Sequence, residues 1–196
     1  IHSKTFDNGM ICASEQAVIV LDSIYDQVKA EFQNNRCYFL TPDEAAKVGE
    51  VFFNAATHGV RAKAVGRPAV TLAQMAGITV PADTKVLIAE TDDTSHDNPW
   101  ANEKLCPVLG MYRAKNFAQA LDICYKLVSE GGPGHSGALY VDPTEREKID
   151  AFGVRMKTAR ILVNIPTAFG GIGDLYNFDT APSLTLGPGS WGGSSF

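Results

Sequence analysis

Residues 17–34 read AVIVLDSIYDQVKAEFQN, an apolar run followed directly by a segment with helical spacing. The first five residues form a continuous apolar stretch, which is long enough for a buried strand and too short for a helix. Asp22 or Ser23 is expected to cap the helix that follows, because both side chains accept hydrogen bonds from the free N–H groups of a first turn. A strand joined to a helix in this way is the unit from which parallel sheets are built.

The same alternation of strands and helices continues along the chain. TPDE at residues 41–44 is a capping box with Pro42 at the first helical position, so it predicts a second helix. Further strands are predicted at residues 85–89, 108–113, 138–141 and 160–165, and further helices at residues 68–76, 117–130 and 143–156. Since no repeat or linker divides the chain, we predict one α/β domain with a mostly parallel sheet flanked by helices.

Composition limits the classes of protein to which the chain can belong. It has 196 residues, of which 45% are hydrophobic and 20% charged, and a net charge of −5. These values are typical of a soluble globular domain and argue against disordered, collagenous and coiled-coil classes. The mild acidic excess gives no sign of the basic surface that would bind nucleic acid or an anionic membrane. No apolar run approaches the roughly 20 residues that span a bilayer, so neither kind of partner is expected.

Four cysteines are widely spaced along the chain, at Cys12, Cys37, Cys106 and Cys124. They form no C-x-x-C pair, and no spaced pair of histidines lies near them in the sequence, so we expect no metal site. Their low frequency is typical of reduced thiols in a cytoplasmic protein rather than of a disulfide scaffold. The structural interpretation of each is a small buried hydrophobic residue.

Glycines are concentrated in the final part of the chain, residues 166–196, which we assign to the same domain. No dinucleotide or phosphate-loop fingerprint stands in register there, because the glycine clusters lack a following helix and a lysine. Two interpretations stay open. The backbone either turns tightly against another surface or lines a substrate passage.

Three residues combine a reactive side chain with a position in a loop. Cys12 follows the turn-forming DNG of residues 7–9 and precedes a predicted strand, where backbone N–H groups or cations can favour the thiolate. His135 is preceded by Gly134 and could serve as the base that a cysteine nucleophile needs. Glu103 ends the polar loop of residues 90–103, where its carboxylate could accept hydrogen bonds from sugar hydroxyls, although a solvated glutamate is the simpler interpretation. Residue types alone suggest a cysteine hydrolase or acyltransferase.

Five motifs, in this order along the chain, resemble those of the CoA-acylating aldehyde dehydrogenases, in particular the aldehyde dehydrogenase half of bifunctional aldehyde–alcohol dehydrogenases. They are KTFDNGMICASEQ (4–16), EKLCPV (103–108), GHS (134–136), MKTARILVN (156–164) and SLTLGPGSWGG (183–193). The resemblance covers nearly the whole chain.

The resemblance implies a chemistry for four residues. Cys12 matches the catalytic cysteine, which attacks the aldehyde. After hydride transfer to NAD the cysteine carries an acyl group as a thioester, and this acyl group then passes to CoA. The backbone N–H of Cys12 would help to hold the developing oxyanion. Glu103 matches the glutamate that bonds the nicotinamide ribose, Leu186 would lie near the nicotinamide, and His135 matches a histidine of the acylating branch with a role in the thiol–CoA step.

The resemblance also implies how the chain is organised. Residues 1–196 match the cysteine-bearing catalytic subdomain, whereas the coenzyme domain and the iron-dependent alcohol dehydrogenase half are absent from them. The expected substrates are acetaldehyde or another short aldehyde with CoA, and a homo-oligomer, a dimer or a filament, is expected. The chain alone is expected to supply the nucleophile without full activity. Two alternatives stay open: in isolation the chain is a catalytically inert structural or oligomerisation module, or it is a cysteine hydrolase that uses Cys12 and His135.

Overall fold

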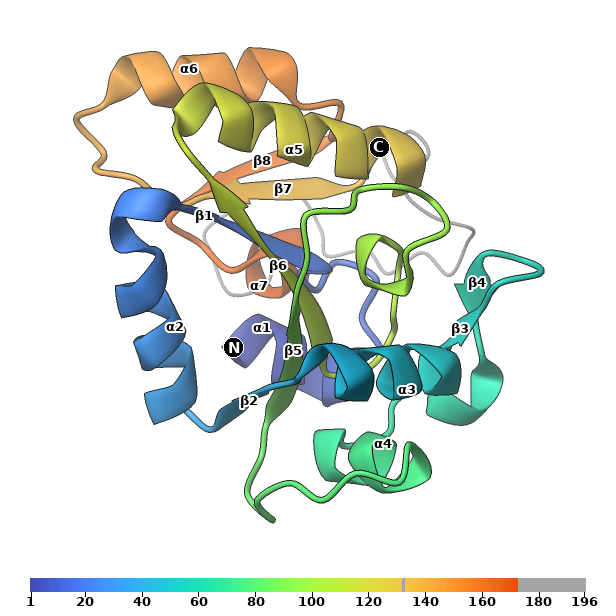
Figure 1. The fold of residues 1–196 in the computed structure, drawn as a ribbon. Helices are drawn as coiled ribbons and strands as arrows, with labels where there is room; N and C mark the ends of the chain where they lie inside the picture. Colours follow the sequence, from blue (N-terminus) through green and yellow to red (C-terminus); the bar gives the residue numbers. More distant parts are fainter. Residues whose placement is uncertain (132, 173–196) are drawn as a thin grey trace.

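The computed structural model describes residues 1–131 and 133–172, which are built around a parallel sheet with helices on both faces (Figure 1). Its four strands lie in the order β1-β6-β5-β2, and every neighbouring pair is parallel. Their bounds are β1 (Ala17–Leu21), β2 (Cys37–Phe39), β5 (Val86–Glu90) and β6 (Val108–Ala114). The order departs from the chain order because the connections cross over helices, as parallel pairing requires.

The two faces of this sheet are separated by the alternation of side chains along its central strands. Val86 and Ile88 of β5 pack with α2 (Tyr25–Asn34), whereas Leu87 and Ala89 point to the opposite face. Because both faces are covered, β5 is apolar along almost its whole length, as strands of parallel sheets commonly are.

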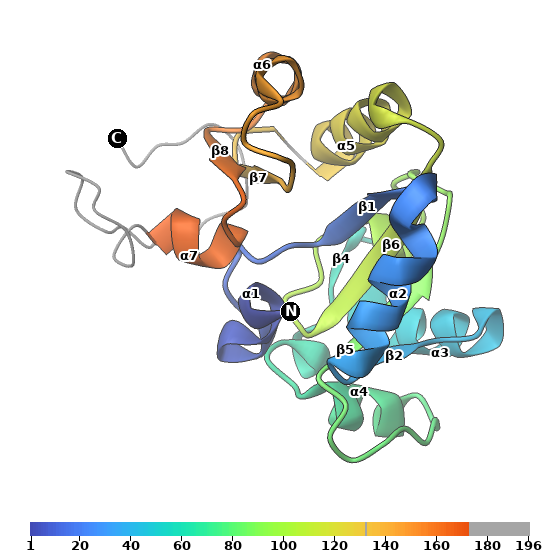
Figure 2. The same cartoon turned by 90° about the vertical axis from the view of Figure 1, so that its left-hand side faces the viewer.

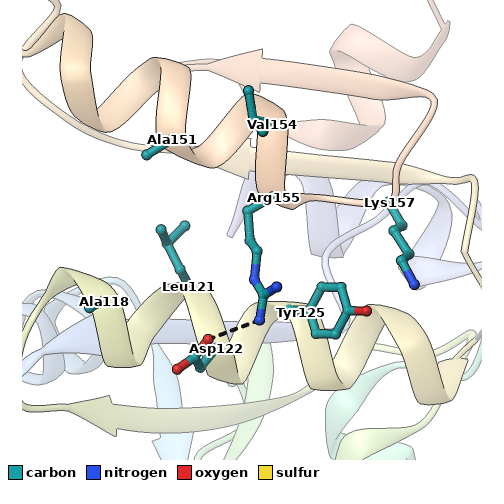
Figure 3. A pocket seen from close by; sticks show the side chains of 8 residues that line it. All are labelled: Ala118, Leu121, Asp122, Tyr125, Ala151, Val154, Arg155 and Lys157. Carbon is teal, nitrogen blue, oxygen red and sulfur yellow. Dashed lines mark hydrogen bonds and ion pairs between the residues drawn. The ribbon is translucent and has the colours of Figure 1, made fainter.

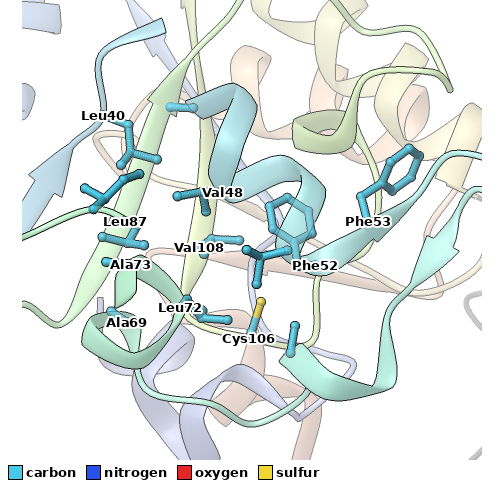
Figure 4. Packing of buried hydrophobic residues seen from close by; sticks show 14 of the residues in the cluster. Leu40, Val48, Phe52, Phe53, Ala69, Leu72, Ala73, Leu87, Cys106 and Val108 are labelled. Carbon is cyan, nitrogen blue, oxygen red and sulfur yellow. The ribbon is translucent and has the colours of Figure 1, made fainter. Parts of the chain in front are cut away.

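The larger core cluster lies between the sheet, α3 (Pro42–Phe52) and α4 (Ala69–Met75) (Figure 4). Phe52 of α3 meets Trp100 edge to face, with 5.3 Å between the ring centroids. On the same face, Leu127 of α5 (Phe117–Gly131) packs with Tyr112 of β6. These contacts bury the apolar stripe of each helix.

A second, two-stranded parallel sheet pairs β7 (Ser136–Leu139) with β8 (Arg160–Val163), with Ser136 opposite Arg160. In both views, α5 and α6 (Arg146–Arg155) lie at the opposite end of the molecule from α3 and α4 (Figures 1 and 2). The remaining elements are α1 (His2–Thr5), the antiparallel pair β3 (Phe53–Asn54) and β4 (Gly59–Val60), and α7 (Thr167–Ile172).

The predicted α/β fold is confirmed, and the local signals near α3, α4 and α5 are confirmed as well. Thr41 and Glu44 form the predicted capping box, α4 is followed by Gly77 at φ +71°, and the Asn116 side chain caps α5 by accepting a hydrogen bond from the Gln119 N–H.

Several predicted boundaries are wrong. Asp22 and Ser23 do not cap a helix, because residues Asp22–Ile24 form a 3-10 turn and α2 begins only at Tyr25 without a side-chain cap. The strand predicted at 138–141 lies at Ser136–Leu139, where pairing with β8 sets its position. The helix predicted from residue 143 begins at Arg146, because Asp142 and Thr144 form a hydrogen-bonded turn before it.

Candidate active site

The three predicted site residues that the structure describes all lie just before parallel strands. Cys12 precedes β1, Glu103 precedes β6, and His135 precedes β7. They therefore lie at the amino ends of the strands, whereas ligands of open α/β sheets usually bind at the carboxyl ends. The fourth predicted residue, Leu186, lies outside the described residues, as does most of the glycine-rich region.

Cys12 is half-buried in the loop between α1 and β1, and its thiol is subject to opposing influences. Burial, and then the negative charge of Glu103, raise the pKa of the thiol above its usual value. The backbone N–H groups of Cys12 and Ala13, and then the charge of Arg160, act in the other direction. The sulfur thus has backbone donors beside it, and at neutral pH the thiol needs a proton acceptor before it can react.

His135 has properties that suit a proton acceptor. It is half-buried, and burial, followed by the positive charge of Arg160, lowers the pKa of its imidazole below the usual value. Its Nδ1 lies 3.1 Å from the Ser136 hydroxyl, and its carbonyl accepts a hydrogen bond from the Arg160 N–H. Since Arg160 acts on both His135 and Cys12, the two predicted residues share one electrostatic neighbourhood.

Glu103 lies on the surface, but neighbouring protein still removes part of the hydration of its carboxylate. This desolvation raises the pKa of Glu103, while the charges of Lys4 and then Lys104 lower it. Its own charge in turn acts on Cys12. Charge interactions thus link Cys12 to Glu103, and Arg160 to both Cys12 and His135, although the three predicted residues come from different loops.

The loop that carries Cys12 rests directly on the segment after Glu103. Asp7, Asn8 and Gly9 have positive φ angles, and a Cβ atom added to Gly9 would lie 2.8 Å from both the carbonyl carbon and the carbonyl oxygen of Cys106. Only glycine permits such a close approach of two backbones at that φ. Gly9 therefore fixes how the cysteine loop meets the 103–107 segment.

Two lysines that sequence reasoning missed are buried beneath this junction. The Lys4 ammonium group lies 3.2 Å from Gln16 Oε1 and 3.5 Å from Ser14 Oγ. Lys104 Nζ donates to the carbonyls of Gln16, at 2.9 Å, and Asn102, at 2.5 Å. Their sequence neighbours gave no sign of burial, because a lysine is almost never fully buried. Arg160 was missed too, although it lies inside one of the five motifs.

The other cysteines differ from Cys12 in their surroundings. Cys37 and Cys106 are buried, as the structural interpretation predicted, and burial raises the pKa of each thiol to about 11. Cys124 on α5 is only half-buried, so the expectation of full burial is wrong for it. Its pKa is also raised to about 11 by loss of solvation, which keeps the thiol protonated at neutral pH.

A groove lies between α5 and α6, and none of the predicted site residues lines it (Figure 3). Its charged groups are already engaged. Arg155 pairs with Asp122 at 3.1 Å and stacks over the Tyr125 ring at 4.0 Å, and Lys157 lies 4.9 Å from that ring.

Within residues 1–131 and 133–172, no three histidine, cysteine or acidic side chains come together as a metal site would require. Across the same residues, no helix combines the length and the apolar character needed to cross a bilayer.

Known proteins resemble the chain over nearly its full length. It is 50% identical over 194 residues to the bifunctional aldehyde-alcohol dehydrogenase of Escherichia coli K12, and 52% identical over 196 residues to the aldehyde-alcohol dehydrogenase of Clostridium acetobutylicum. These matches cover 98% and 100% of this chain but 22% of either relative. No protein-family model matches.

A solved structure is similar as well. The acetylating aldehyde dehydrogenase of Geobacillus thermoglucosidasius superposes with a TM-score of 0.87 at 39% identity, over 96% of this chain and 40% of that protein. The fold, the ordered motifs and these similarities define the class: over nearly its whole length the chain is similar to acylating aldehyde dehydrogenases, of which it spans only part. Within that class, it is similar to the aldehyde dehydrogenase part of the bifunctional aldehyde–alcohol dehydrogenases.

Proposed function

We propose that this chain is the cysteine-bearing catalytic part of an NAD-dependent enzyme that interconverts a short aldehyde plus CoA with the corresponding acyl-CoA, with acetaldehyde and acetyl-CoA as the preferred pair. The observation that carries this proposal is the close packing of the Cys12 loop on the 103–107 segment, where Gly9 meets Cys106, together with the charge of Arg160, which acts on both Cys12 and His135. The similarity to acylating aldehyde dehydrogenases over nearly the whole chain supports it.

In this proposal Cys12 is the nucleophile. Its sulfur attacks the aldehyde carbonyl, and the backbone N–H groups beside it stabilise the negative charge that develops on the oxygen. Loss of hydride from the carbon leaves a thioester on Cys12, and CoA then takes the acyl group and returns the free thiol. Burial, and then the charge of Arg160, lower the pKa of His135, so its neutral imidazole accepts the proton of the CoA thiol in this last step.

NAD supplies the hydride acceptor when bound. Glu103 fits a role in holding it, because its carboxylate lies at the surface beside Cys12 and has no hydrogen bond or ion pair within residues 1–131 and 133–172. Its oxygens can therefore accept bonds from the ribose hydroxyls. Leu186 completes the nicotinamide environment in this proposal.

The remaining parts of the proposal concern the whole protein. The chain spans about a fifth of its bifunctional relatives, so we propose that the coenzyme domain and an iron-dependent alcohol dehydrogenase half are supplied by other parts of a longer protein. We also propose a homo-oligomer and a cytoplasmic location. Four cysteines without a disulfide agree with a reducing compartment.

The test is a Cys12→Ala substitution in the complete enzyme, assayed as acetyl-CoA-dependent oxidation of NADH. We expect the activity to fall by at least about 10³-fold, because no covalent intermediate can form. Cys124→Ala is the matched control, since that half-buried thiol on α5 has no role in the proposed chemistry, and it should retain near-normal activity.

Near-normal activity of Cys12→Ala would contradict the proposal. Two further results would favour the alternatives. Thioester hydrolysis without NAD would indicate a cysteine hydrolase. Failure of residues 1–196 alone to bind NAD in calorimetry would favour the inert oligomerisation module, and micromolar binding would contradict it.

A further inference from the structure

Gln16 is the residue through which the loop of Cys12 is hydrogen-bonded to the segment that carries Glu103. Its side-chain Nε2 donates to the carbonyl of Ser14, two residues after the cysteine, at 3.1 Å. Its Oε1 accepts the backbone N–H of Lys104, the residue after Glu103, at 3.1 Å. One side-chain amide thus joins two loops that lie 88 residues apart in the chain.

The backbone of Gln16 makes the same connection a second time. Its carbonyl accepts a hydrogen bond from Lys104 Nζ at 2.9 Å, and this Nζ also donates to the Asn102 carbonyl at 2.5 Å. Asn102 and Lys104 are 5% and 0% exposed, whereas Glu103 between them lies on the surface. The carboxylate is therefore carried by a segment that is anchored on both sides, and Gln16 holds one of the two anchors.

These hydrogen bonds fix the spacing of the two loops because they involve buried groups. Ser14 and Lys104 are 3% and 0% exposed, and Gln16 Oε1 also accepts the ammonium group of the buried Lys4 at 3.2 Å. A buried donor or acceptor that loses its partner costs free energy, so the network resists rearrangement. A change at Gln16 therefore alters the position of one loop relative to the other.

The two half-reactions of the proposed chemistry depend differently on this spacing. Transfer of the acyl group between CoA and Cys12 takes place on the cysteine loop and makes no use of Glu103. For hydride transfer, in contrast, Cys12 must hold the acyl carbon in register with the cofactor that Glu103 holds. A misplacement of about 1 Å can slow such a step by about 10²-fold. A residue that joins the two loops thus has a larger effect on hydride transfer than on acyl transfer.

We propose that Gln16 is a positioning residue for hydride transfer: its side-chain amide, bonded to Ser14 on one side and to the Lys104 N–H on the other, sets the position of Cys12 relative to Glu103. This inference rests on the proposed function, because it assumes that Cys12 carries the acyl group and that Glu103 holds the cofactor. In this role Gln16 touches neither the substrate nor the cofactor.

The experiment compares the two half-reactions in the complete enzyme carrying Gln16→Met, a side chain of similar length without the amide. We expect single-turnover reduction of the acetylated enzyme by NADH to slow by about tenfold or more. Exchange of isotopically labelled CoA with acetyl-CoA, measured without cofactor, should stay within about twofold of the wild type. Gln33→Met, at an exposed glutamine of α2, is the matched control and should change neither rate. A loss of folded enzyme would lower both rates by the same factor, so their ratio isolates the positioning role.

A second readout needs no turnover. Iodoacetamide alkylates Cys12, and mass spectrometry follows the rate with and without saturating NAD⁺. Bound NAD⁺ should slow alkylation in the wild type, because in the proposed complex the nicotinamide covers the thiol. In Gln16→Met the protection should be at least about threefold weaker, since the two loops are out of register.

If Gln16→Met does not fold, Gln16→Glu replaces it. Its carboxylate still accepts from Lys104 and Lys4 but cannot donate to the Ser14 carbonyl, so the ratio of the two rates should fall in the same direction. Equal changes in the two rates, or no change in either, would overturn the inference. If the wild type itself exchanges no CoA, or if Glu103→Gln leaves NAD⁺ affinity unchanged, the proposed role of Cys12 or of Glu103 is wrong instead.

Discussion

At the scale of single residues, the region around Cys12 contains buried charged groups as well as the charged groups on its surface. Two lysines that are 1% and 0% exposed lie under the loop, while Glu103 and Arg160 act on the thiol with opposite signs. Burial and the charge of Glu103 raise the pKa of the thiol, so it is protonated at neutral pH in the absence of a reaction partner. Reactivity here depends on the balance of neighbouring charges.

The buried Lys4 predicts a specific dependence of stability on pH. Its folded-state pKa is about 8, against 10.5 in the unfolded chain, so between these values the unfolded state binds one more proton. The free energy of unfolding should therefore rise with pH in this window, by up to about 3 kcal/mol from this group. Urea unfolding of the wild type and of Lys4→Met between pH 7 and 10.5 isolates the contribution of Lys4.

The difference between the two proteins is the informative quantity, because the other titrating groups cancel. At pH 7 Lys4→Met should be at least as stable as the wild type. As the pH rises, the free energy of unfolding of the wild type should increase relative to that of Lys4→Met. A difference that stays constant across the window would show that Lys4 titrates normally in the folded state.

At the scale of elements, a helix start can be predicted from nearby residues where a side chain caps the first turn. The α3 helix begins with a reciprocal capping box, in which the Thr41 hydroxyl accepts the Glu44 N–H and the Glu44 carboxylate accepts the Thr41 N–H. The Thr41 N–H bond is also the main reason that the pKa of Glu44 is lowered. The helix then places Val48 and Phe52 in the core (Figure 4).

Removing this cap should have a measurable cost. We expect Thr41→Ala to lower the free energy of unfolding by about 1 kcal/mol, because the first turn loses a hydrogen-bond acceptor. Glu50→Ala, on the exposed surface of the same helix, is the control and should change stability by less than about 0.5 kcal/mol. Equal effects of the two substitutions in chemical denaturation would contradict the assigned role of the cap.

At the scale of the whole molecule, the site exists because segments far apart in the chain meet at the amino ends of parallel strands. The cysteine loop contacts the 103–107 segment through Gly9, and α7 returns to the N-terminal region, where Ser3 Oγ accepts the Ala168 N–H at 2.9 Å. The pairing of β1 with β6 brings the loops before these strands together, and the pairing of β7 with β8 places Arg160 opposite Ser136, next to His135.

Two glycines with the same backbone conformation provide a matched test of the junction. Gly9 and Gly77 have φ angles of +73° and +71°, but a Cβ atom on Gly77 would meet nothing within 4 Å. Gly77→Ala should cost about 1 kcal/mol from backbone strain alone. Gly9→Ala should cost roughly 2 kcal/mol more and also impair acetyl-CoA reduction, because the clash with Cys106 displaces the cysteine loop.

Thermal unfolding and steady-state kinetics of the two variants check this prediction. The control should keep its activity while losing a little stability. Comparable behaviour of Gly9→Ala and Gly77→Ala would mean that the close approach of the two backbones is unimportant.

The sequence by itself determined the alternation of strands and helices, the capping of α3 and the stop after α4, because each depends on side chains only a few residues apart. It also singled out Cys12, Glu103 and His135, since reactive side chains in loops before strands can be recognised locally. It missed β2, a strand of three residues, because such a short segment carries too little periodicity to be distinguished from a loop.

Only the tertiary structure decided how the charges of the site are arranged. Nothing in the residues next to Lys4 or Lys104 predicts burial, because the segments that cover them come from elsewhere in the chain. The influence of Arg160 on both Cys12 and His135 likewise arises from the pairing of β7 with β8. Desolvation and charge–charge interactions depend on distances in space, and those distances are set by packing rather than by the order of residues.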